Sequence, residues 1–203
     1  MRKAMKKLLC LWSGPFFIFS CGSAPLPWAV NDEVETTPRL GVRLFWKGDR
    51  LIREEQDRDN DGRPEIWIYY FAGKRDRQEE DTNGDGRPDL WTYYLEEKLD
   101  KQERDTDRDG RPDLWFFFSA SENIERKWKD TIDDEEPNIW IYYEAGQIVK
   151  EEQDQNGDGR LDLIAHYQGG KLTYQEEDIN RDGKMDLWSI YTQGEITRQE
   201  EDT

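Results

Sequence analysis

A repeat of 24 residues fills most of this 203-residue chain and limits what the chain can fold into. Its units begin at Asp57, Asp81, Asp105, Asp130, Asp154, Asp178 and Asp202. The spacing is 24 residues except between Asp105 and Asp130, where it is 25. Each unit holds an acidic loop, an aromatic run, a short turn and a charged run. A fixed period of this length is typical of proteins that stack one supersecondary unit on the next.

The aromatic run of each unit is predicted to be a β-strand. The runs hold about six residues rich in Trp, Tyr, Phe and Ile and show no helical period. One register position carries Trp67, Trp91, Trp115, Trp140 and Trp188. A second ring column is expected on the opposite face, because side chains alternate along a strand; it carries Tyr70, Tyr94, Phe118, Tyr143, Tyr167 and Tyr191. The charged runs are predicted to be return strands of hairpins, with turns such as residues 145–147 and 168–171.

These elements predict an all-β fold, an antiparallel β-meander repeat in a single-layer or solenoid-like ribbon. Residues 40–56 are interpreted as a half repeat, so about thirteen strands would extend on the order of 60 Å. The aliphatic stems of charged residues are expected to cover the rings of neighbouring strands. Sheets beyond about ten strands tend to curl or split, so two stacked sheets are also open. A β-propeller fits less well, because two-stranded units leave too few blades to close.

Five of the loops share the pattern D-x-[DN]-x-D-G-x-x-[DE], which suits Ca²⁺. This hard cation takes six to eight oxygen ligands at about 2.4 Å. In a tightly curled loop, positions 1, 3 and 5 point inward, a glycine at position 6 permits the reversal, and position 7 offers its carbonyl oxygen. Crowded carboxylates repel one another, and a divalent cation removes that cost. The predicted metal ligands are Asp57, Asp59, Asp61, Glu65, Asp81, Asn83, Asp85, Asp89, Asp105, Asp107, Asp109, Asp113, Asp154, Asn156, Asp158, Asp162, Asp178, Asn180, Asp182 and Asp186.

These loops resemble the calcium loops of EF-hands, dockerins and thrombospondin type 3 repeats. That resemblance implies Ca²⁺ as the bound ion and places calcium-binding loops between the hairpins. The loops depart from EF-hands because no helices flank them and no Glu stands at position 12, so helix-opening sensing is not implied. Position 12 holds Ile68, Thr92, Phe116, Ala165 and Ser189 instead. The hairpins are similar, more loosely, to bacterial MORN-type repeats. The other interpretation of a single such loop is an acidic turn without an ion.

The loop of the fourth unit is predicted to have lost its ion. It keeps Asp130 and Asp134 in register, but Ile132 replaces the ligand at position 3 and Glu135 replaces the glycine. Asn138 stands at position 9. The strand that follows retains the aromatic pattern.

The N-terminus is typical of a bacterial lipoprotein precursor. A basic start leads into a mostly apolar stretch, too short to span a membrane comfortably. The sequence Ile18-Phe19-Ser20-Cys21 resembles a lipobox, although Phe19 departs from the usual residue. The resemblance implies a signal peptide at residues 1–20, lipidation of Cys21, a tether over 21–38 and a repeat domain over 39–203. It also implies an outer-membrane or cell-surface location, with the periplasmic face possible. An ordinary signal peptide with an incidental Cys is the alternative.

Charge and composition exclude several classes of function. The net charge of -17 argues against a nucleic-acid partner, which needs a basic surface. No cysteine follows Cys21, so no disulfide is expected in the mature chain. No catalytic residue is predicted: His166, the single histidine, falls in an aromatic column, and no Ser has a plausible base. A glutamate column before the loops is interpreted as a solvated edge, at Glu55, Glu79, Glu103, Glu152, Glu176 and Glu200.

The sequence therefore predicts a non-enzymatic, calcium-binding, lipid-anchored envelope protein. We expect a structural or adhesion-type interaction module that binds the membrane through Cys21 and a protein or glycan through its repeat surface. An immunity or inhibitor protein, suggested by the MORN-like resemblance, is the alternative from another class. A glycan-binding module, with sugars stacked on the tryptophan column, and an enzyme accessory domain are further possibilities.

Overall fold

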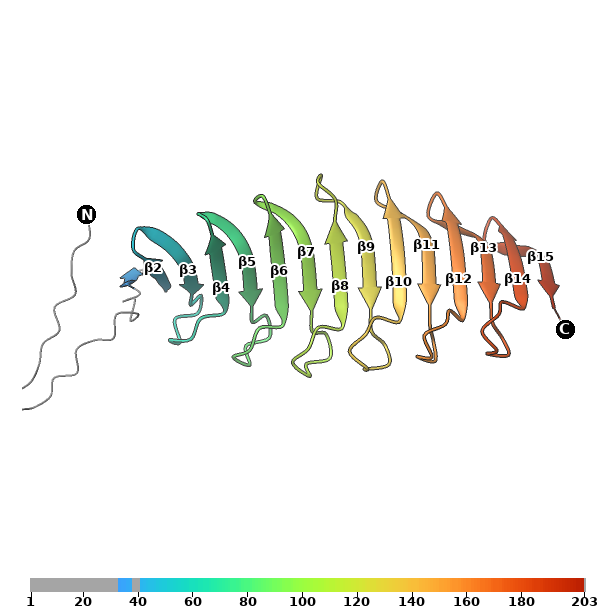
Figure 1. Cartoon of the computed structure of the whole chain (residues 1–203), viewed down its shortest axis with the longest axis horizontal. Helices are drawn as coiled ribbons and strands as arrows, with labels where there is room; N and C mark the ends of the chain where they lie inside the picture. The colour runs from blue at the N-terminus through green and yellow to red at the C-terminus, as the bar shows by residue number, and fades with distance from the viewer. Residues whose placement is uncertain (1–32, 38–40, 203) are drawn as a thin grey trace, which may run out of the picture. The chain divides into compact units, whose positions relative to one another are not determined.

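The computed structural model describes residues 33–37 and 41–202, which form one open antiparallel sheet and contain no helix. Its fifteen strands follow one another in sequence order from β1 to β15 (Figure 1). Every contact between described strands joins sequence neighbours. The predicted all-β meander is confirmed. The strands are β1 (Glu33–Thr37), β2 (Val42–Lys47), β3 (Arg50–Gln56), β4 (Ile66–Phe71), β5 (Lys74–Glu80), β6 (Leu90–Leu95), β7 (Lys98–Arg104), β8 (Leu114–Phe118), β9 (Ile124–Lys129), β10 (Ile139–Glu144), β11 (Gln147–Gln153), β12 (Leu163–Gln168), β13 (Lys171–Glu177), β14 (Leu187–Thr192) and β15 (Glu195–Glu201).

The N-terminal part of the sheet has two more strands than the sequence indicates. Within residues 40–56, interpreted as a half repeat, residues 42–56 form the full hairpin of β2 and β3, since a turn at Gly48 divides the two strands. The strand β1 pairs with β2 along its whole length. Strand pairing thus begins at residue 33, within the range assigned to the tether.

The predicted signal peptide, the lipidated Cys21 and most of the tether lie outside the described residues. The described residues all fall in one compact unit, Asp32–Thr203. Within that unit no helix is long and apolar enough to cross a membrane.

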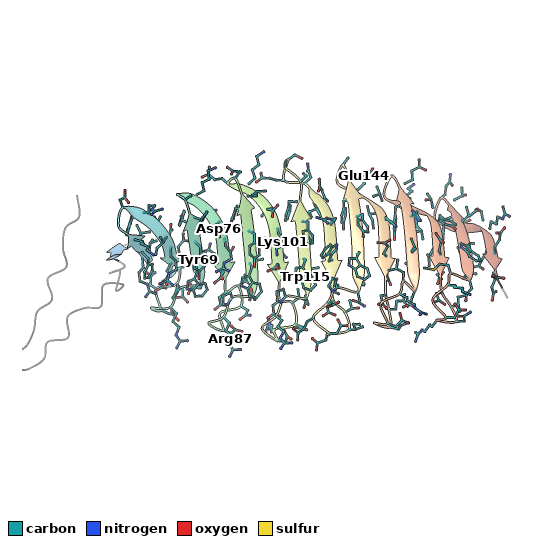
Figure 2. All side chains as sticks on the ribbon, viewed as in Figure 1. Tyr69, Asp76, Arg87, Lys101, Trp115 and Glu144 are labelled. Carbon is teal, nitrogen blue, oxygen red and sulfur yellow. The ribbon has the colours of Figure 1, made fainter. Side chains whose placement is uncertain are left out.

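The two faces of the sheet carry different ring columns. We call the face with Trp67, Trp91, Trp115, Trp140 and Trp188 the Trp face. Tyr70 lies three residues after Trp67 within β4 and so points to the other face, which we call the Tyr face. Cross-strand neighbours share a face, so Glu79, opposite Trp67, belongs to the Trp face. The side chains of both faces appear in Figure 2.

Each of the seven hairpins from β2–β3 to β14–β15 contains a β-bulge that the sequence does not reveal. In the hairpin of β4 and β5, Tyr69 pairs with Arg77 and Tyr70 pairs with Arg75, which leaves Asp76 as an extra residue. A bulge increases the local twist of its strand. The extra residues, one per return strand, are Ile52, Asp76, Asp100, Glu125, Val149, Thr173 and Thr197.

Little of the sheet forms a closed apolar core. Among residues 41–202, the fully buried apolar side chains are Ile66, Ile68 and Ala165. The rings are instead covered by long cationic side chains, as the sequence predicts. The guanidinium of Arg53 lies 3.9 Å from the Phe45 ring centre, and the ammonium of Lys101 lies 4.4 Å from that of Tyr93. Such contacts bury stems while the charge stays near water.

Candidate metal centres

The six acidic loops lie along one edge of the sheet, and the tight hairpin turns lie along the other (Figure 1). We number the loops 1 to 6 in chain order. They are residues 57–65, 81–89, 105–113, 130–138, 154–162 and 178–186. Each connects a return strand to the next aromatic strand.

Loop 1 turns its acidic side chains inward onto its own backbone. Asp57 Oδ2 accepts a hydrogen bond from the Gly62 N–H at 2.9 Å, and Asp59 Oδ1 accepts one from the Asp61 N–H at 3.0 Å. Glu65 Oε2 accepts one from the Arg58 N–H at 2.6 Å. Gly62 has a φ of 95°, a conformation that other residues adopt with difficulty. The loop therefore folds around its carboxylates.

The carboxylates of loop 1 suit a divalent cation. Asp57, Asp59, Asp61 and Glu65 each offer one oxygen, and these oxygens lie within 4.8 Å of one another. Asp57 Oδ1 is buried and has no hydrogen-bond partner. A buried oxygen without a donor is costly, and a bound cation would satisfy it. The donor set, all carboxylate oxygen, matches the preference of Ca²⁺.

Loop 3 gathers a similar cluster. Oxygens of Asp105, Asp107 and Asp109 lie within 4.8 Å of one another. The Asp109 N–H donates to Asp107 and lowers the pKa of that carboxyl. Desolvation and the carboxylates of Asp109, Asp113 and Asp105 outweigh this effect, so the pKa of Asp107 is raised overall. Desolvation is the larger of the raising causes, and the neighbouring negative charges add to it.

Loops 2, 5 and 6 keep the same backbone frame with fewer carboxylates, because Asn occupies position 3. In loop 2, Asp81 accepts from the Gly84 and Gly86 N–H groups, both at 2.7 Å, and Asp89 accepts from the Thr82 side chain. Within the described residues, three or more carboxylates come within reach of a single ion only in loops 1 and 3. The predicted ligands at positions 1 and 9 of loops 2, 5 and 6 are buried and serve this frame: Asp81, Asp89, Asp154, Asp162, Asp178 and Asp186.

Loop 4 has the same frame without the ligand set. Asp130 Oδ2 accepts from the Glu135 N–H at 3.0 Å, and Asn138 Oδ1 accepts from the Thr131 N–H at 2.8 Å. Ile132, where the other loops carry Asp or Asn, packs against Gly157 of loop 5. Glu135 holds a φ of 74° at the glycine position, and its carboxylate pairs with Arg111 of loop 3. No oxygen ligand stands at position 3.

Successive loops are joined by a backbone ladder. The N–H of each position 1 donates to the position 9 carbonyl of the preceding loop, as Asp81 does to Glu65 at 2.8 Å and Asp105 does to Asp89 at 3.0 Å. Gly41 replaces the missing earlier loop and accepts from the Asp57 N–H at 2.7 Å. The last predicted ligand residue of one loop is thus hydrogen-bonded to the first predicted ligand residue of the next loop.

The glutamate column on the Trp face is a solvated edge only at Glu200, whose side chain is 57% exposed; the other members of the column are buried or half-buried. The Glu79 and Glu103 side chains are only 16% and 14% exposed. Each lies opposite a tryptophan, pairs with the cation two residues earlier, and accepts a tyrosine hydroxyl; for Glu103 these partners are Trp91, Lys101 and Tyr93. The sequence of the return strand alone does not show this environment, because Trp91 and Tyr93 belong to the neighbouring strand β6.

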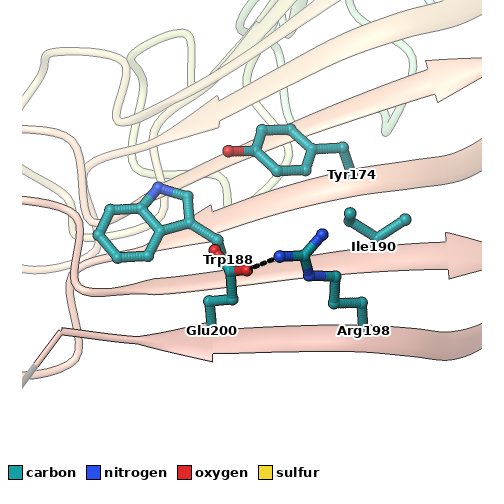
Figure 3. Close-up of a pocket in the computed structure, with 5 residues that line it drawn as sticks. All are labelled: Tyr174, Trp188, Ile190, Arg198 and Glu200. Carbon is teal, nitrogen blue, oxygen red and sulfur yellow. Dashed lines mark hydrogen bonds and ion pairs between the residues drawn. The ribbon is translucent and has the colours of Figure 1, made fainter.

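These contacts shift the ionisation of the column. Burial, followed by the hydrogen bond to Glu103, raises the pKa of Tyr93. For Glu152, burial alone would raise the pKa, but hydrogen bonds from Lys150 and Tyr142 lower it overall. Figure 3 shows the last repeat of this pattern, in which Arg198 pairs with Glu200 beside Trp188. His166 occupies the position of the tyrosines and lies 5.7 Å from the Tyr174 ring, as its place in the column predicts.

No family model matches the chain, and no curated protein is found as its relative.

Proposed function

We propose that this chain is a calcium-stabilised repeat protein of a bacterial cell envelope, with a non-enzymatic structural or interaction role. The observation that carries the proposal is loop 1. Its four carboxylates converge within 4.8 Å, and Asp57 Oδ1 is buried without a partner. The same sequence pattern in loops 2, 3, 5 and 6 extends the proposal to five ions.

The ion would be held by side-chain oxygens at positions 1, 3, 5 and 9, with the carbonyl of position 7 as a further donor. Bound Ca²⁺ supplies two positive charges per loop and so offsets the mutual repulsion of the carboxylates. The chain's own residues do the rest: positions 1 and 9 build the hydrogen-bond frame, and positions 3 and 5 add oxygens. The metal is a folding ligand in this scheme, because the sheet has few buried apolar residues of its own.

Isothermal calorimetry of the metal-stripped chain tests the proposal directly. We expect five calcium ions per chain, with dissociation constants of about 10⁻⁴–10⁻³ M, as in extracellular calcium modules. Mg²⁺ at the same concentration should give far less heat, since it demands a small octahedral site. A chain that takes up no calcium would refute the proposal, and six comparable sites would refute the assignment of loop 4.

The envelope location depends on the lipobox-like segment and is tested separately. We expect Cys21→Ser to abolish metabolic labelling by a fatty acid and to release the protein from bacterial membranes. The released protein should keep its calcium stoichiometry, because the loops lie far along the chain from Cys21. Membrane fractionation of the variant identical to wild type would contradict the anchor.

An interaction role follows from the open surface of the sheet. The Trp face presents half-buried rings and paired charges instead of a covered apolar layer. Among the candidate ligands, we favour a glycan, because Trp128 interrupts the repeat of the Trp face and adds a third indole between Trp115 and Trp140.

A further inference from the structure

We call the residues that one return strand and its two neighbouring aromatic strands place on the Trp face a cell of that face. One cell, on the strands β8, β9 and β10, is irregular. Trp128 of β9 lies directly opposite Trp115 of β8 and directly opposite Trp140 of β10. Three indoles therefore lie side by side over about 10 Å, two strand spacings. In the other return strands of the face, the position of Trp128 holds a glutamate: Glu55, Glu79, Glu103, Glu152, Glu176 and Glu200.

Because Trp128 stands at the glutamate position, the basic residue two positions earlier, Arg126, has no carboxylate to pair with there. In the regular cells the basic residue pairs with the glutamate two positions later, as Arg77 does with Glu79 at 3.0 Å. Arg126 occupies the basic position beside Trp128, and within the described part of the chain it forms no ion pair. Its side chain is exposed, and its guanidinium lies 4.7 Å from the Phe117 ring centre.

The packing of the sheet does not account for Trp128. Its indole Nε1–H is buried and has no acceptor, and the ion pair of the regular cell is lost. The gain is a ring contact, with the Phe117 centre at 4.4 Å, and a cation–π contact, with the Arg126 guanidinium 5.6 Å from the Trp128 ring centre. The glutamates on either side, Glu103 and Glu152, are neutralised by Lys101 at 2.9 Å and Lys150 at 2.5 Å. Arg126 is therefore the uncompensated charge of this cell, on a chain whose net charge is -17.

We propose that Trp115, Trp128, Trp140 and Arg126 bind an acidic glycan. The C–H groups of a pyranose ring are weakly positive and stack on the negative faces of indole rings. A row of three indoles matches two linked sugar rings. The exposed guanidinium pairs with a sugar carboxylate through two parallel hydrogen bonds. An acidic peptide would satisfy Arg126 but would leave the row of rings without flat partners.

This inference rests on the proposed interaction role but not on the calcium loops. Its test is a tryptophan-fluorescence titration of the whole chain, in buffer saturated with calcium, with three probes. These are an oligogalacturonate, a neutral galacto-oligosaccharide of the same length, and poly-glutamate. We expect the oligogalacturonate to bind at least about tenfold more tightly than the neutral sugar, and poly-glutamate not to bind.

Two variants and a matched control locate the site. Arg126→Gln should reduce the affinity for the acidic sugar to that for the neutral one. Arg77→Gln, which removes an ion-paired arginine from the same row, should leave both affinities unchanged. Trp128→Glu restores the residue of the other units, so the sheet should keep its near-ultraviolet dichroism and its five calcium ions while both sugars lose binding. Loss of sugar binding with an unchanged calcium count separates this site from the metal loops.

Three outcomes would overturn the proposal. The first is no binding of the oligogalacturonate by the wild-type chain, and the second is equal affinity for the acidic and neutral sugars. The third is binding of poly-glutamate that depends on Arg126, which would identify the partner as an acidic protein. None of these results changes the calcium count, so the proposed metal function would stand or fall on calorimetry alone.

Discussion

Loops 1 and 4 have the same backbone but different ligand sets. In both, the aspartate at position 1 accepts the N–H of position 6, from Gly62 at 2.9 Å in loop 1 and from Glu135 at 3.0 Å in loop 4. Position 9 accepts the N–H of position 2 in each. The frame of positions 1 and 9 therefore suffices to build the loop.

Comparison of the two loops shows which acidic residues are needed for the backbone conformation and which only add negative charge. Loop 4 reaches its conformation with Ile132 at position 3, so Asp59 of loop 1 is not needed for the turn. Loop 1 nevertheless brings four carboxylates within 4.8 Å, which costs electrostatic energy in the absence of a cation. Under the proposed function an ion would account for the extra acidic residues of loop 1, and loop 4, which has no oxygen ligand at position 3, is the internal reference.

Removal of calcium should have the largest effect. With free Ca²⁺ tenfold above the dissociation constant, each site stabilises the folded state by about 1.4 kcal/mol, or about 7 kcal/mol for five sites. We expect EGTA to lower the thermal midpoint strongly, to shift tryptophan emission to the red, and to flatten near-ultraviolet dichroism. Unchanged spectra and melting temperature in EGTA would show that the sheet folds without metal.

A matched pair of substitutions at position 5 compares the loops residue by residue. Asp61→Ala and Asp134→Ala each remove one turn hydrogen bond, from the Arg63 N–H at 2.7 Å and from the Glu136 N–H at 3.1 Å. The structural cost is therefore similar. We expect calorimetry of the Asp61 variant to give four ions and of the Asp134 variant to give five. The Asp61 variant should also lose about 1.4 kcal/mol more stability in calcium.

The backbone ladder between loops adds a further expectation to that pair. Because the Asp81 N–H donates to the Glu65 carbonyl, a loosened loop 1 should weaken calcium binding by loop 2. No such effect should follow from Asp134→Ala, since loop 4 is predicted to bind no ion in either form. Equal changes in both variants would remove the distinction between the two loops.

Conversion of loop 4 into a binding loop should have a smaller effect. Ile132→Asp with Glu135→Gly restores the pattern of the other loops, so calorimetry should give a sixth ion. The glycine also removes the strain of a left-handed Glu135, which should stabilise the fold by about 1 kcal/mol. Loss of the exposed ion pair between Glu135 and Arg111 should cost at most about that much. Glu135→Gly alone should leave the count at five, because Ile132 offers no oxygen. A sixth ion in that single variant would contradict the role assigned to position 3.

The sequence predicts those parts of the fold that repeat along the chain. The period, the strands, the opposite faces of Trp67 and Tyr70, and the loop residues all follow from spacing. Ile132 and Glu135 mark loop 4 as the exception in the sequence, and in the structure Ile132 packs against Gly157 while Glu135 pairs with Arg111. Repetition makes such signals strong because each unit gives the same answer.

Features that depend on cross-strand register could not be predicted. The bulge at Asp76 changes which residues face each other without altering the composition of the strand. Glu103 stands in a charged run, which indicates a solvated edge, yet its partners Trp91 and Tyr93 lie on the neighbouring strand. The sequence gives no signal for Trp128, because only the cross-strand register with Trp115 and Trp140 shows the row of three indoles.

The smallest effect we expect is a difference in pH dependence that calcium reverses. In the metal-free chain, desolvation and the neighbouring carboxylates raise the pKa of Asp107 in loop 3 above its unfolded value of about 3.9. Between these two pKa values the folded state binds more protons than the unfolded state, so stability falls as pH rises through this window. In EGTA, the contribution of Asp107 should therefore favour folding at pH 5 relative to pH 7. In calcium the sign reverses, since protons compete with the ion. Urea unfolding at both pH values, with wild type compared against Asp107→Asn, isolates this one carboxyl from groups such as Glu152, whose lowered pKa acts in the opposite direction. If the difference between wild type and variant has the same sign in EGTA and in calcium, the carboxylates of loop 3 do not form a cation site.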